Sequence, residues 1–310
     1  MTLFLYALLF GFYFYSIMQL LTPRPWSEYE LIDCGGFEKL ERFGPYVLAR
    51  PEPQAIWDKT LSTEEWEKRA QAYFKREKGN SERGEWLTKA KMPDHWNSYV
   101  PIDGKRLQYK LALSSFKHVG LFPEQAANWD YIYQKTKAMP GTPKVLNLFA
   151  YTGVASLAAR AAKADVTHVD SVKQVISWSR ENMELSSLDN IRWIVEDAMK
   201  FVKREVRRGN HYQGILLDPP AYGRGPDGEK WVLEEHINEM LKLCKELLDP
   251  EHHFFLVNLY SLSFSALIAE SLILRIFDKV QNPEFGELYL PDSFGKKLPL
   301  GVFHRFSTEI

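Results

Sequence analysis

One stretch of the chain, residues 144–158, constrains the fold more than any other. It reads Lys-Val-Leu-Asn-Leu-Phe-Ala-Tyr-Thr-Gly-Val-Ala-Ser-Leu-Ala. The apolar run 145–149 is typical of a buried parallel strand, and the alanine-rich segment 154–164 has strong helix propensity. The tight turn 150–153 lies between them. A strand that leads into a helix through such a turn opens a βαβ unit, in which the helix N-terminus directs free N–H groups at a bound ligand.

The turn contains a single glycine, Gly153, and this fact discriminates between cofactors. A dinucleotide-binding turn would carry the pattern G-x-G-x-x-G. One glycine allows the backbone to approach a compact anion, such as an amino-acid carboxylate, rather than to wrap a pyrophosphate. The turn therefore argues against a nicotinamide-dependent reductase.

Three more apolar segments are typical of buried strands, and a polar group ends or follows each of them. Segment 166–170 ends in Asp170, segment 191–195 precedes Glu196-Asp197-Ala198, and segment 212–217 precedes Asp218-Pro-Pro-Ala-Tyr222. The carboxyl ends of parallel strands meet at one edge of an open α/β sheet, where ligands bind. An acid at Asp170 suits the ribose hydroxyls of NAD and of S-adenosylmethionine alike. Dehydrogenases offer no counterpart for Asp-Pro-Pro, so the pattern favours S-adenosylmethionine.

Taken in order, these motifs resemble those of class I S-adenosylmethionine-dependent methyltransferases, in particular the group related to bacterial large-subunit rRNA methyltransferases. The motifs that carry the resemblance are Asn147-Leu-Phe-Ala-Tyr-Thr-Gly153, Asp170-Ser171, Glu196-Asp-Ala198 and Asp218-Pro-Pro-Ala-Tyr-Gly223. The resemblance covers roughly residues 105–310 and, more weakly, the N-terminal part. It implies an α/β fold with a Rossmann-like seven-stranded sheet, completed by an antiparallel pair at 287–290 and 302–306.

The resemblance also implies roles for single residues at the donor site. Gly153 and the amides around Thr152 would hold the donor carboxylate, and Asp170 would accept hydrogen bonds from the ribose. Asp197 would accept from the adenine amino group, with the Ala198 N–H facing the ring. The set expected to bind the donor is Asn147, Phe149, Ala150, Tyr151, Thr152, Gly153, Asp170, Ser171, Asp197 and Ala198.

The segment 115–125, which precedes a helix expected over 126–137, has two readings. In relatives the matching segment folds over the cofactor pocket, which would place His118 and Gln125 near the methionine moiety of the donor. The alternative is an ordinary strand-to-helix connection with a solvated histidine.

The stretch 218–222 is the expected reaction edge, with Asp218, Pro219, Pro220 and Tyr222 as the catalytic group. The two prolines fix the backbone and remove its N–H donors. Carbonyls and the Asp218 carboxylate are left as hydrogen-bond acceptors, which suits an acceptor amino group or a base edge. Tyr222 either stacks on a flipped base or caps the sheet.

Cysteine placement bears on the chemistry. Methylation at pyrimidine C5 normally uses a thiolate that first adds to the ring, but Ala221 follows the two prolines and Tyr260-Ser-Leu-Ser follows the fifth strand. The two cysteines, Cys34 and Cys244, are far apart in sequence and show no metal-ligand spacing. We therefore favour N- or O-methylation over C5-methylation and expect no metal.

The resemblance implies rRNA as the partner. The charge of the chain says less about the partner than the motifs do. The formal net charge of −1 exerts no general attraction on nucleic acid, so any RNA affinity must come from local groups. The basic run in 200–208 has helical spacing and is expected to be a solvated face. Arg224 and Lys230, beside the reaction edge, are better candidates for phosphate contacts. A small-molecule or protein acceptor, and a non-catalytic donor-binding module, stay open as alternatives.

The 310 residues divide into three zones. Residues 1–17 are apolar and uncharged, and they are either an upstream artefact before a start at Met18 or a membrane anchor. Residues 18–105 are expected to form a β-rich substrate-side module with a helix over 63–76, and residues 106–310 the methyltransferase domain. In either case the catalytic part should face the cytoplasm, where its methyl donor is found.

Overall fold

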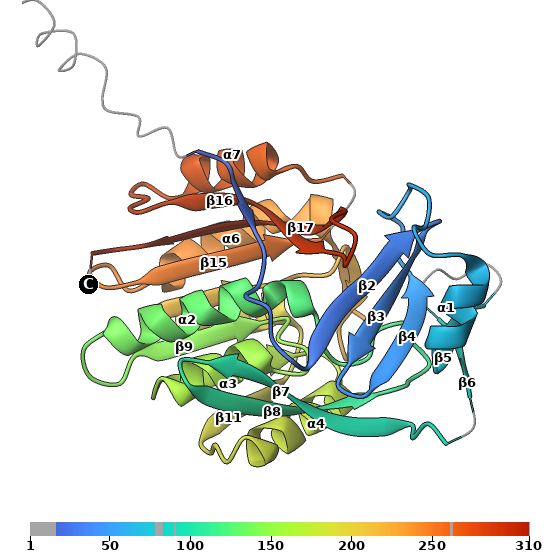
Figure 1. The fold of residues 1–310 in the computed structure, drawn as a ribbon. Helices are drawn as coiled ribbons and strands as arrows, with labels where there is room; N and C mark the ends of the chain where they lie inside the picture. Colours follow the sequence, from blue (N-terminus) through green and yellow to red (C-terminus); the bar gives the residue numbers. More distant parts are fainter. Residues whose placement is uncertain (1–16, 78–82, 90, 261–262, 310) are drawn as a thin grey trace, which may run out of the picture.

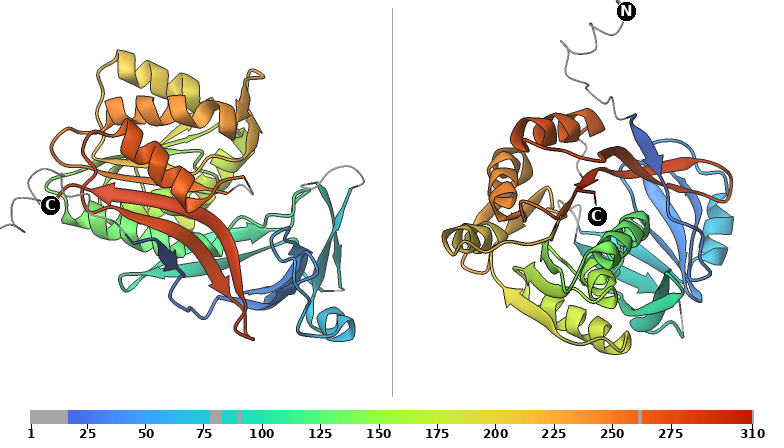
Figure 2. Two further views of the ribbon diagram at one scale, coloured as in Figure 1. Left: turned by 90° about the horizontal axis from the view of Figure 1, so that it is seen from above. Right: turned by 90° about the vertical axis from the view of Figure 1, so that its left-hand side faces the viewer.

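The computed structural model describes residues 17–77, 83–89, 91–260 and 263–309. Its centre is an eight-stranded sheet with helices on both faces (Figures 1 and 2). The sheet order is β1-β16-β17-β15-β12-β9-β10-β11. The strands are β1 (Gln19–Leu21), β9 (Lys144–Leu148), β10 (Asp165–Asp170), β11 (Ile191–Val195), β12 (Gly214–Leu217), β15 (Phe254–Leu259), β16 (Glu284–Pro291) and β17 (Lys297–Ser307).

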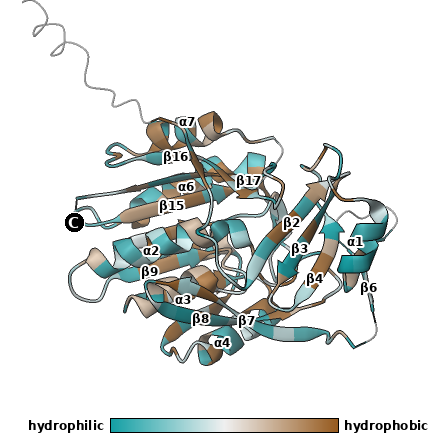
Figure 3. Ribbon diagram, viewed as in Figure 1, coloured by the Kyte–Doolittle hydropathy of each residue, from teal (hydrophilic) through white to brown (hydrophobic). Residues whose placement is uncertain are grey.

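Alternating side chains of the strands enter two different cores. In β9, Val145 packs with helices α2 (Ala126–Ala138) and α3 (Val154–Ala161), whereas Leu146 packs on the opposite face. That opposite face is covered by α5 (Ala198–Arg207), α6 (Leu233–Leu247) and α7 (Ala266–Ile276). All six residues of β15 are buried, and Figure 3 shows this strand as largely hydrophobic. The α/β fold predicted from the sequence is confirmed.

Strand order sets the position of the ligand site. Strand β9 pairs in parallel with β10 on one side and with β12 on the other. The chain therefore builds outward from β9 to β11 and then crosses back to β12. Such a reversal leaves a crevice at the carboxyl ends of the two central strands, which is where open α/β sheets bind ligands. The predicted antiparallel pair β16–β17 is present and lies beside β15.

The seven expected strands are present, and the N-terminal strand β1 joins the sheet as an eighth. It pairs in parallel with β16, and Gln19 faces Gly286. A Cβ atom on Gly286 would lie 1.8 Å from the carbonyl oxygen of Gln19. The glycine thus permits the close approach of β1, which a search for long apolar strands does not reveal.

A second sheet forms most of the N-terminal module, in the order β2-β3-β4-β5-β6. Its strands are β2 (Tyr29–Gly35), β3 (Glu38–Phe43), β4 (Tyr46–Pro51), β5 (Ala72–Arg76) and β6 (Gly84–Thr88). Figure 1 shows this sheet at the end of the large sheet toward which β15 points. The module therefore stands beside the carboxyl edge of the parallel strands.

The helix predicted over 63–76 is shorter than expected. Helix α1 spans Thr63–Arg69, with Ser62 and Glu65 forming a capping box at its start. Residues 72–76 instead form β5, which pairs with β4 and β6. Ala72 and Phe74 are buried on one face of this strand, so burial with period two overrides the local helix propensity.

A hairpin links the module to the large domain. Strands β7 (His95–Ile102) and β8 (Lys105–Ala112) pair along their whole length. Strand β8 packs against α4 (Lys173–Leu185), where the Asn182 side chain accepts a hydrogen bond from Lys110 N at 2.8 Å. The boundary expected between residues 105 and 106 therefore falls at the start of β8, inside one hairpin.

Candidate donor site and reaction edge

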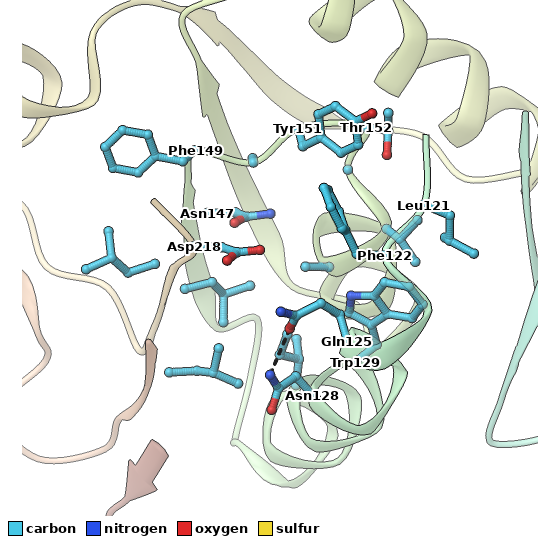
Figure 4. Close-up of a pocket in the computed structure, with 18 residues that line it drawn as sticks. Leu121, Phe122, Gln125, Asn128, Trp129, Asn147, Phe149, Tyr151, Thr152 and Asp218 are labelled. Carbon is cyan, nitrogen blue, oxygen red and sulfur yellow. Dashed lines mark hydrogen bonds between the residues drawn. The ribbon is translucent and has the colours of Figure 1, made fainter. Parts of the chain in front are cut away.

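A pocket opens at the carboxyl ends of β9 and β12, beside the start of α2 (Figure 4). Its lining includes Asn147, the turn 149–153, Gln125 and Asp218, so the fold brings together residues that the sequence analysis took from three separate motifs. Their roles in binding stay predictions. The full lining is Leu121, Phe122, Gln125, Asn128, Trp129, Ile132, Asn147, Phe149, Ala150, Tyr151, Thr152, Gly153, Val154, Ala155, Leu216, Leu217, Asp218 and Leu256.

The turn between β9 and α3 is held in an unusual backbone conformation. Phe149, Tyr151 and Gly153 all have positive φ, at 54°, 48° and 88°. A Cβ atom on Gly153 would also lie 3.2 Å from side-chain atoms of His168 and Ser179. Positive φ is costly for residues other than glycine and persists only where the surroundings impose it. This turn is therefore a rigid wall of the pocket.

Two side chains of α4 impose that conformation. Ser179 donates to the carbonyl of Tyr151 at 2.7 Å, and Asn182 donates to the carbonyl of Thr152 at 2.9 Å. With its carbonyls held from behind, the turn presents its other side to the pocket. The amides of Tyr151 and Gly153 already donate within the protein, to Asp170 and to the carbonyl of Ala150. A role in holding the donor carboxylate stays a prediction for Thr152 N and the first amides of α3.

Asp170 supports the turn from the end of β10. Its two carboxylate oxygens accept hydrogen bonds from Tyr151 N and from Val172 N, each at 2.9 Å. Burial raises the pKa of Asp170, and these backbone hydrogen bonds oppose the rise. Each oxygen of a carboxylate has a second lone pair, so the residue retains the capacity to accept from ribose hydroxyls. Asp170 does not line the pocket described above.

Three other predicted donor-site residues also lie outside that pocket. Asp197 caps α5, where its Oδ1 accepts from Lys200 N at 2.9 Å. Ala198 is buried in the core beneath α5. The Ser171 hydroxyl donates to the carbonyl of Arg224 at 3.2 Å. Their contacts with a donor stay predictions.

The segment 115–125 does lie against the pocket. The Thr152 hydroxyl donates to the carbonyl of Gly120 at 2.7 Å, which ties the segment to the turn. Leu121, Phe122 and Gln125 line the pocket, whereas His118 does not. The ring centroid of His118 lies 5.0 Å from that of Phe122, so the histidine contacts a lining residue without lining the pocket itself.

A chain of buried hydrogen bonds fixes the Gln125 amide. Its Oε1 accepts from Asn128 Nδ2 at 2.8 Å, and Asn128 Oδ1 accepts from Arg305 at 3.2 Å. Arg305 in turn pairs with Glu284 at 2.6 Å. Because its oxygen is occupied, Gln125 presents its amide nitrogen to the pocket (Figure 4). Such a donor suits the carboxylate of an amino-acid moiety.

Asp218 lies at the floor of the pocket beside Asn147 (Figure 4). Its Oδ1 accepts from Asn258 Nδ2 at 2.8 Å. Surrounding protein raises the pKa of Asp218 to about 6, and the hydrogen bond from Asn258 opposes the rise. More than a third of the residue is nevertheless open to solvent, so water screens part of this effect. The Asp218 carboxylate therefore offers a hydrogen-bond acceptor at the pocket.

The rest of the reaction edge folds as a small hairpin outside the pocket. Strand β13 (Tyr222–Arg224) pairs with β14 (Lys230–Val232), which sets Arg224 opposite Lys230. Both cations are exposed, and Tyr222 is 51% exposed. The contact of Tyr222 with a substrate stays a prediction.

Trp231 anchors this hairpin to the donor site. Its indole N–H donates to the carbonyl of Pro220 at 2.8 Å, and its ring lies 4.7 Å from that of Phe149. Pro219 is buried, and Pro220 is exposed. One of the two proline carbonyls is therefore engaged within the protein.

The basic residues of α5 are largely paired with acids. Lys200 contacts Asp227 at 3.1 Å and also Glu229, and Lys203 contacts Glu239 at 2.7 Å. Arg204 pairs with Glu196, and Arg208 pairs with Glu205 at 3.0 Å. These pairings favour the solvated-face interpretation over an RNA-binding one.

Sequence reasoning missed two asparagines at the site, Asn128 and Asn258. Asn258 is the only polar residue of β15, so an amide in an otherwise apolar strand was the available signal. Asn128 follows Gln125 by three residues, a spacing that places both on one helix face.

Comparison with known proteins agrees with this geometry. A family model described as S-adenosylmethionine-dependent methyltransferase matches residues 67–275. The solved structure of an S-adenosylmethionine-dependent methyltransferase from Agrobacterium tumefaciens is 36% identical, with a TM-score of 0.87 and 94% of each chain covered. The chain belongs to the family of S-adenosylmethionine-dependent methyltransferases, as the sequence motifs predicted, and S-adenosylmethionine is its cofactor.

More distant relatives include a solved structure that shares the fold and curated proteins that match part of the chain. A structure assigned as a methyltransferase complexed with S-adenosylhomocysteine shares the fold at 19% identity and a TM-score of 0.68, over 91% of this chain and 75% of that one. The ribosomal RNA large subunit methyltransferase K/L of Shewanella frigidimarina is 29% identical over 175 residues, which is 52% of this chain and 24% of that protein. The K/L protein of Pseudoalteromonas translucida is 29% identical over 198 residues, 61% of this chain and 27% of that one. The chain thus spans about a quarter of the length of these curated relatives.

Two further observations concern metals and membranes. Among the residues that the structure describes, no group of three histidine, cysteine or acidic side chains is arranged to hold a metal ion. Within the same ranges, no helix is long and apolar enough to cross a membrane. The anchor considered for residues 1–17 lies, apart from Ile17, outside the described residues.

Proposed function

We propose that the protein transfers a methyl group from S-adenosylmethionine to rRNA, at a nitrogen or oxygen acceptor. The observation that carries this proposal is the position of Asp218, an acceptor of hydrogen bonds at the floor of the pocket and at the inner end of an exposed hairpin. Names of the relatives from Shewanella and Pseudoalteromonas support rRNA as the acceptor.

The pocket residues fit the donor. Gln125 offers an amide N–H, and the rigid turn at Gly153 offers backbone at the start of α3 for a carboxylate. Trp129, Phe122 and Leu121 supply apolar surface on the other side of the pocket. When bound, S-adenosylmethionine supplies a methyl group that its sulfonium already activates. The protein then has to orient the acceptor and exclude water.

Asp218 would orient the acceptor. Its carboxylate can accept a hydrogen bond from an amino or hydroxyl group and so aim the lone pair of that group at the methyl carbon. Tyr222, on the exposed hairpin, offers a ring for stacking against a base, and Arg224 and Lys230 offer charge for phosphates. Residues 18–105 would provide the substrate-side module and residues 106–310 the catalytic domain, working in the cytoplasm.

The cysteines support N- or O-methylation. Both thiols are buried, and burial raises the pKa of Cys34 to about 12 and also raises the pKa of Cys244. Cys34 lies in β2 and Cys244 in α6, and neither lines the pocket. A thiol that stays protonated is a poor nucleophile, so a covalent adduct with a pyrimidine ring is not expected.

Tritiated-methyl transfer from S-adenosylmethionine into total RNA, protein and small-molecule fractions tests the proposal. We expect label in rRNA, and Asp218→Ala should lower the transfer rate by roughly 10²–10⁴-fold, the range for a positioned acid–base group. Asp278→Ala, which alters an exposed acid outside the pocket, should leave the rate unchanged. Label that enters only protein or small molecules would reject rRNA as the acceptor.

A further inference from the structure

Asn258 is placed beside Asp218 by the register of the sheet. Strands β12 and β15 are parallel, and Leu217 faces Val257, so the next residue of each strand is also adjacent. The Asn258 side chain is the only amide on β15, and the residue is 2% exposed. Its Nδ2 lies 2.8 Å from Asp218 Oδ1.

Packing alone does not account for an amide at this position. The Oδ1 atom of Asn258 is buried and has no hydrogen-bond partner among the described residues. A Cβ atom on Gly301, across the β15–β17 pair, would lie 3.4 Å from that oxygen. Burying an amide oxygen without a partner destabilises a fold, and such groups in native proteins need an explanation. An apolar side chain of similar size would avoid this cost.

The amide has one orientation that suits an ionised Asp218. If Oδ1 faced the carboxylate, two acceptors would meet, so the N–H must face Asp218 and the amide oxygen must turn into the core. One carboxylate oxygen of Asp218 is then engaged and the other is left for an incoming hydrogen-bond donor.

The other pocket residues around Asp218 do not supply this function. Asn147, its neighbour in Figure 4, donates to Ser156 at 2.9 Å. Helix α2 contributes the neutral residues Asn128, Trp129 and Ile132, with Gln125 at its start. Tyr151 is the only other titratable side chain in the lining, and burial raises its pKa further above the ordinary range. Among the described residues no cation lines the pocket, and Asn258 donates a hydrogen bond to the Asp218 carboxylate.

We propose that Asn258 is a positioning residue for methyl transfer: its amide holds one oxygen of the Asp218 carboxylate, so that the other oxygen is directed at the acceptor. This inference rests on the role proposed for Asp218. It also explains why the strand tolerates an unpartnered amide oxygen, since the position serves the reaction rather than stability.

The test compares the native protein with Asn258→Leu, which removes the donor at similar volume. Stability of the variant should be equal or higher, because the unpartnered oxygen is gone. The acid limb of the pH–rate profile for methyl transfer should move up by about one to two pH units, the shift that corresponds to losing a hydrogen bond to a charged group. The same displacement should appear in an NMR titration of the Asp218 carboxyl group in the protein without RNA. Affinity for S-adenosylhomocysteine should stay within about two-fold.

The outcomes separate this inference from the proposed function. If Asp218→Ala transfers methyl groups at the native rate, the role proposed for Asp218 is wrong, and the role inferred for Asn258 is then wrong as well. If Asp218→Ala is inactive while Asn258→Leu keeps the native pH profile and titration, the inference alone is overturned. Asn258→Ser, which is smaller but keeps a hydroxyl donor, should show a smaller displacement than Asn258→Leu. An equal displacement in both variants would indicate a packing effect and would also overturn it.

Discussion

Glu124 shows how a single residue can be forced into an environment that opposes its charge. It lies in the short 3₁₀ turn Pro123–Gln125, is 5% exposed, and its Oε2 has no hydrogen-bond partner among the described residues. Burial raises the pKa of Glu124 to about 7, although Lys39 and Arg50 oppose the rise. The residue lies within the segment 115–125, between the lining residues Phe122 and Gln125, so its protonation bears on the junction between module and pocket.

Its neighbours form a buried ionic cluster between the N-terminal sheet and Tyr260, which follows β15. Arg50 donates to Glu41 at 2.6 Å, Lys39 contacts Glu52 at 3.1 Å, and the Tyr260 hydroxyl donates to Glu52 at 2.8 Å. Burial alone would raise the pKa of Glu41, but Arg50 and Lys39 outweigh it and lower the pKa to about 2. With two cations and two paired acids already present, Glu124 is the acid left without a counter-charge.

Glu124→Gln should therefore change the pH dependence of stability. Between the ordinary pKa of 4.5 and about 7, the folded protein keeps a proton that the unfolded chain has released, so the free energy of unfolding falls as pH rises. The variant should lack this fall and exceed the native stability at pH 8 by roughly 1–3 kcal/mol. Urea unfolding at pH 5 and pH 8 measures it, with the exposed Glu246→Gln as control. The same slope in native and Glu124→Gln proteins would contradict the assignment.

Among single residues, the sequence predicted those pocket residues that belong to contiguous motifs. Gly153 and Asp218 could be found because their neighbours in the chain reveal a strand end. Asn258 and Asn128 could not be found in that way, because their partners Asp218 and Arg305 are distant in sequence. Hydrogen bonds that cross between elements depend on the assembled sheet.

Among the elements, the segment 115–125 depends on one close contact. Gly120 has a φ of 104°, and a Cβ atom there would lie 2.4 Å from Cζ2 of Trp178 on α4. The glycine thus allows the segment to lie against α4 and to reach Thr152. This contact joins the donor pocket to the hairpin β7–β8, since the Trp178 indole also donates to the carbonyl of Lys110 at 3.0 Å.

Gly120→Ala should lower both stability and affinity for the donor. We expect a loss of roughly 1–3 kcal/mol in the free energy of unfolding, from strain at positive φ combined with overpacking. Gly141→Ala is the matched control, because Gly141 also has positive φ but has open space around it. Unfolding in urea and titration with S-adenosylhomocysteine measure the two effects. Equal losses in the two variants would show that the contact with Trp178 contributes nothing.

Prediction of elements from sequence succeeded where the pattern was long and failed where tertiary pairing decided the outcome. The strands around the donor site and helix α2 were found because apolar runs and helical spacing are local signals. Strand β1 has three residues, and β5 was taken for helix, because only pairing with β16, β4 and β6 defines them.

In the whole molecule, the N-terminal residues contribute to the stability of the large sheet through strand β1. A chain that starts at Met18 retains β1, so it should fold and bind S-adenosylhomocysteine as well as the full chain. A chain that starts at Arg24 lacks β1 and leaves the edge of β16 open, and it should be less stable or aggregate. Circular dichroism, urea unfolding and titration of both chains decide this. Failure of the Met18 chain to fold, while the full chain is soluble without detergent, would show that residues 1–17 are required.

The arrangement of the two sheets relative to each other could not be predicted from the sequence either. Composition indicated a second zone before residue 105, but its docking at the carboxyl edge of the large sheet depends on contacts such as Tyr260 with Glu52 and Arg50 with the carbonyl of Lys117. Charge patterning did not reveal the buried cluster, because its members are spread from Lys39 to Tyr260.

We infer that the turn 150–153, Asp170 and Gln125 form the site for S-adenosylmethionine. Calorimetric titration of S-adenosylhomocysteine and of NADH into the native protein and into Asp170→Ala tests this assignment. We predict micromolar binding of S-adenosylhomocysteine, no binding of NADH, and a loss of roughly 1–3 kcal/mol in Asp170→Ala, the cost of leaving buried hydrogen-bonding groups unpaired. Binding of NADH without any response to S-adenosylhomocysteine would contradict the account.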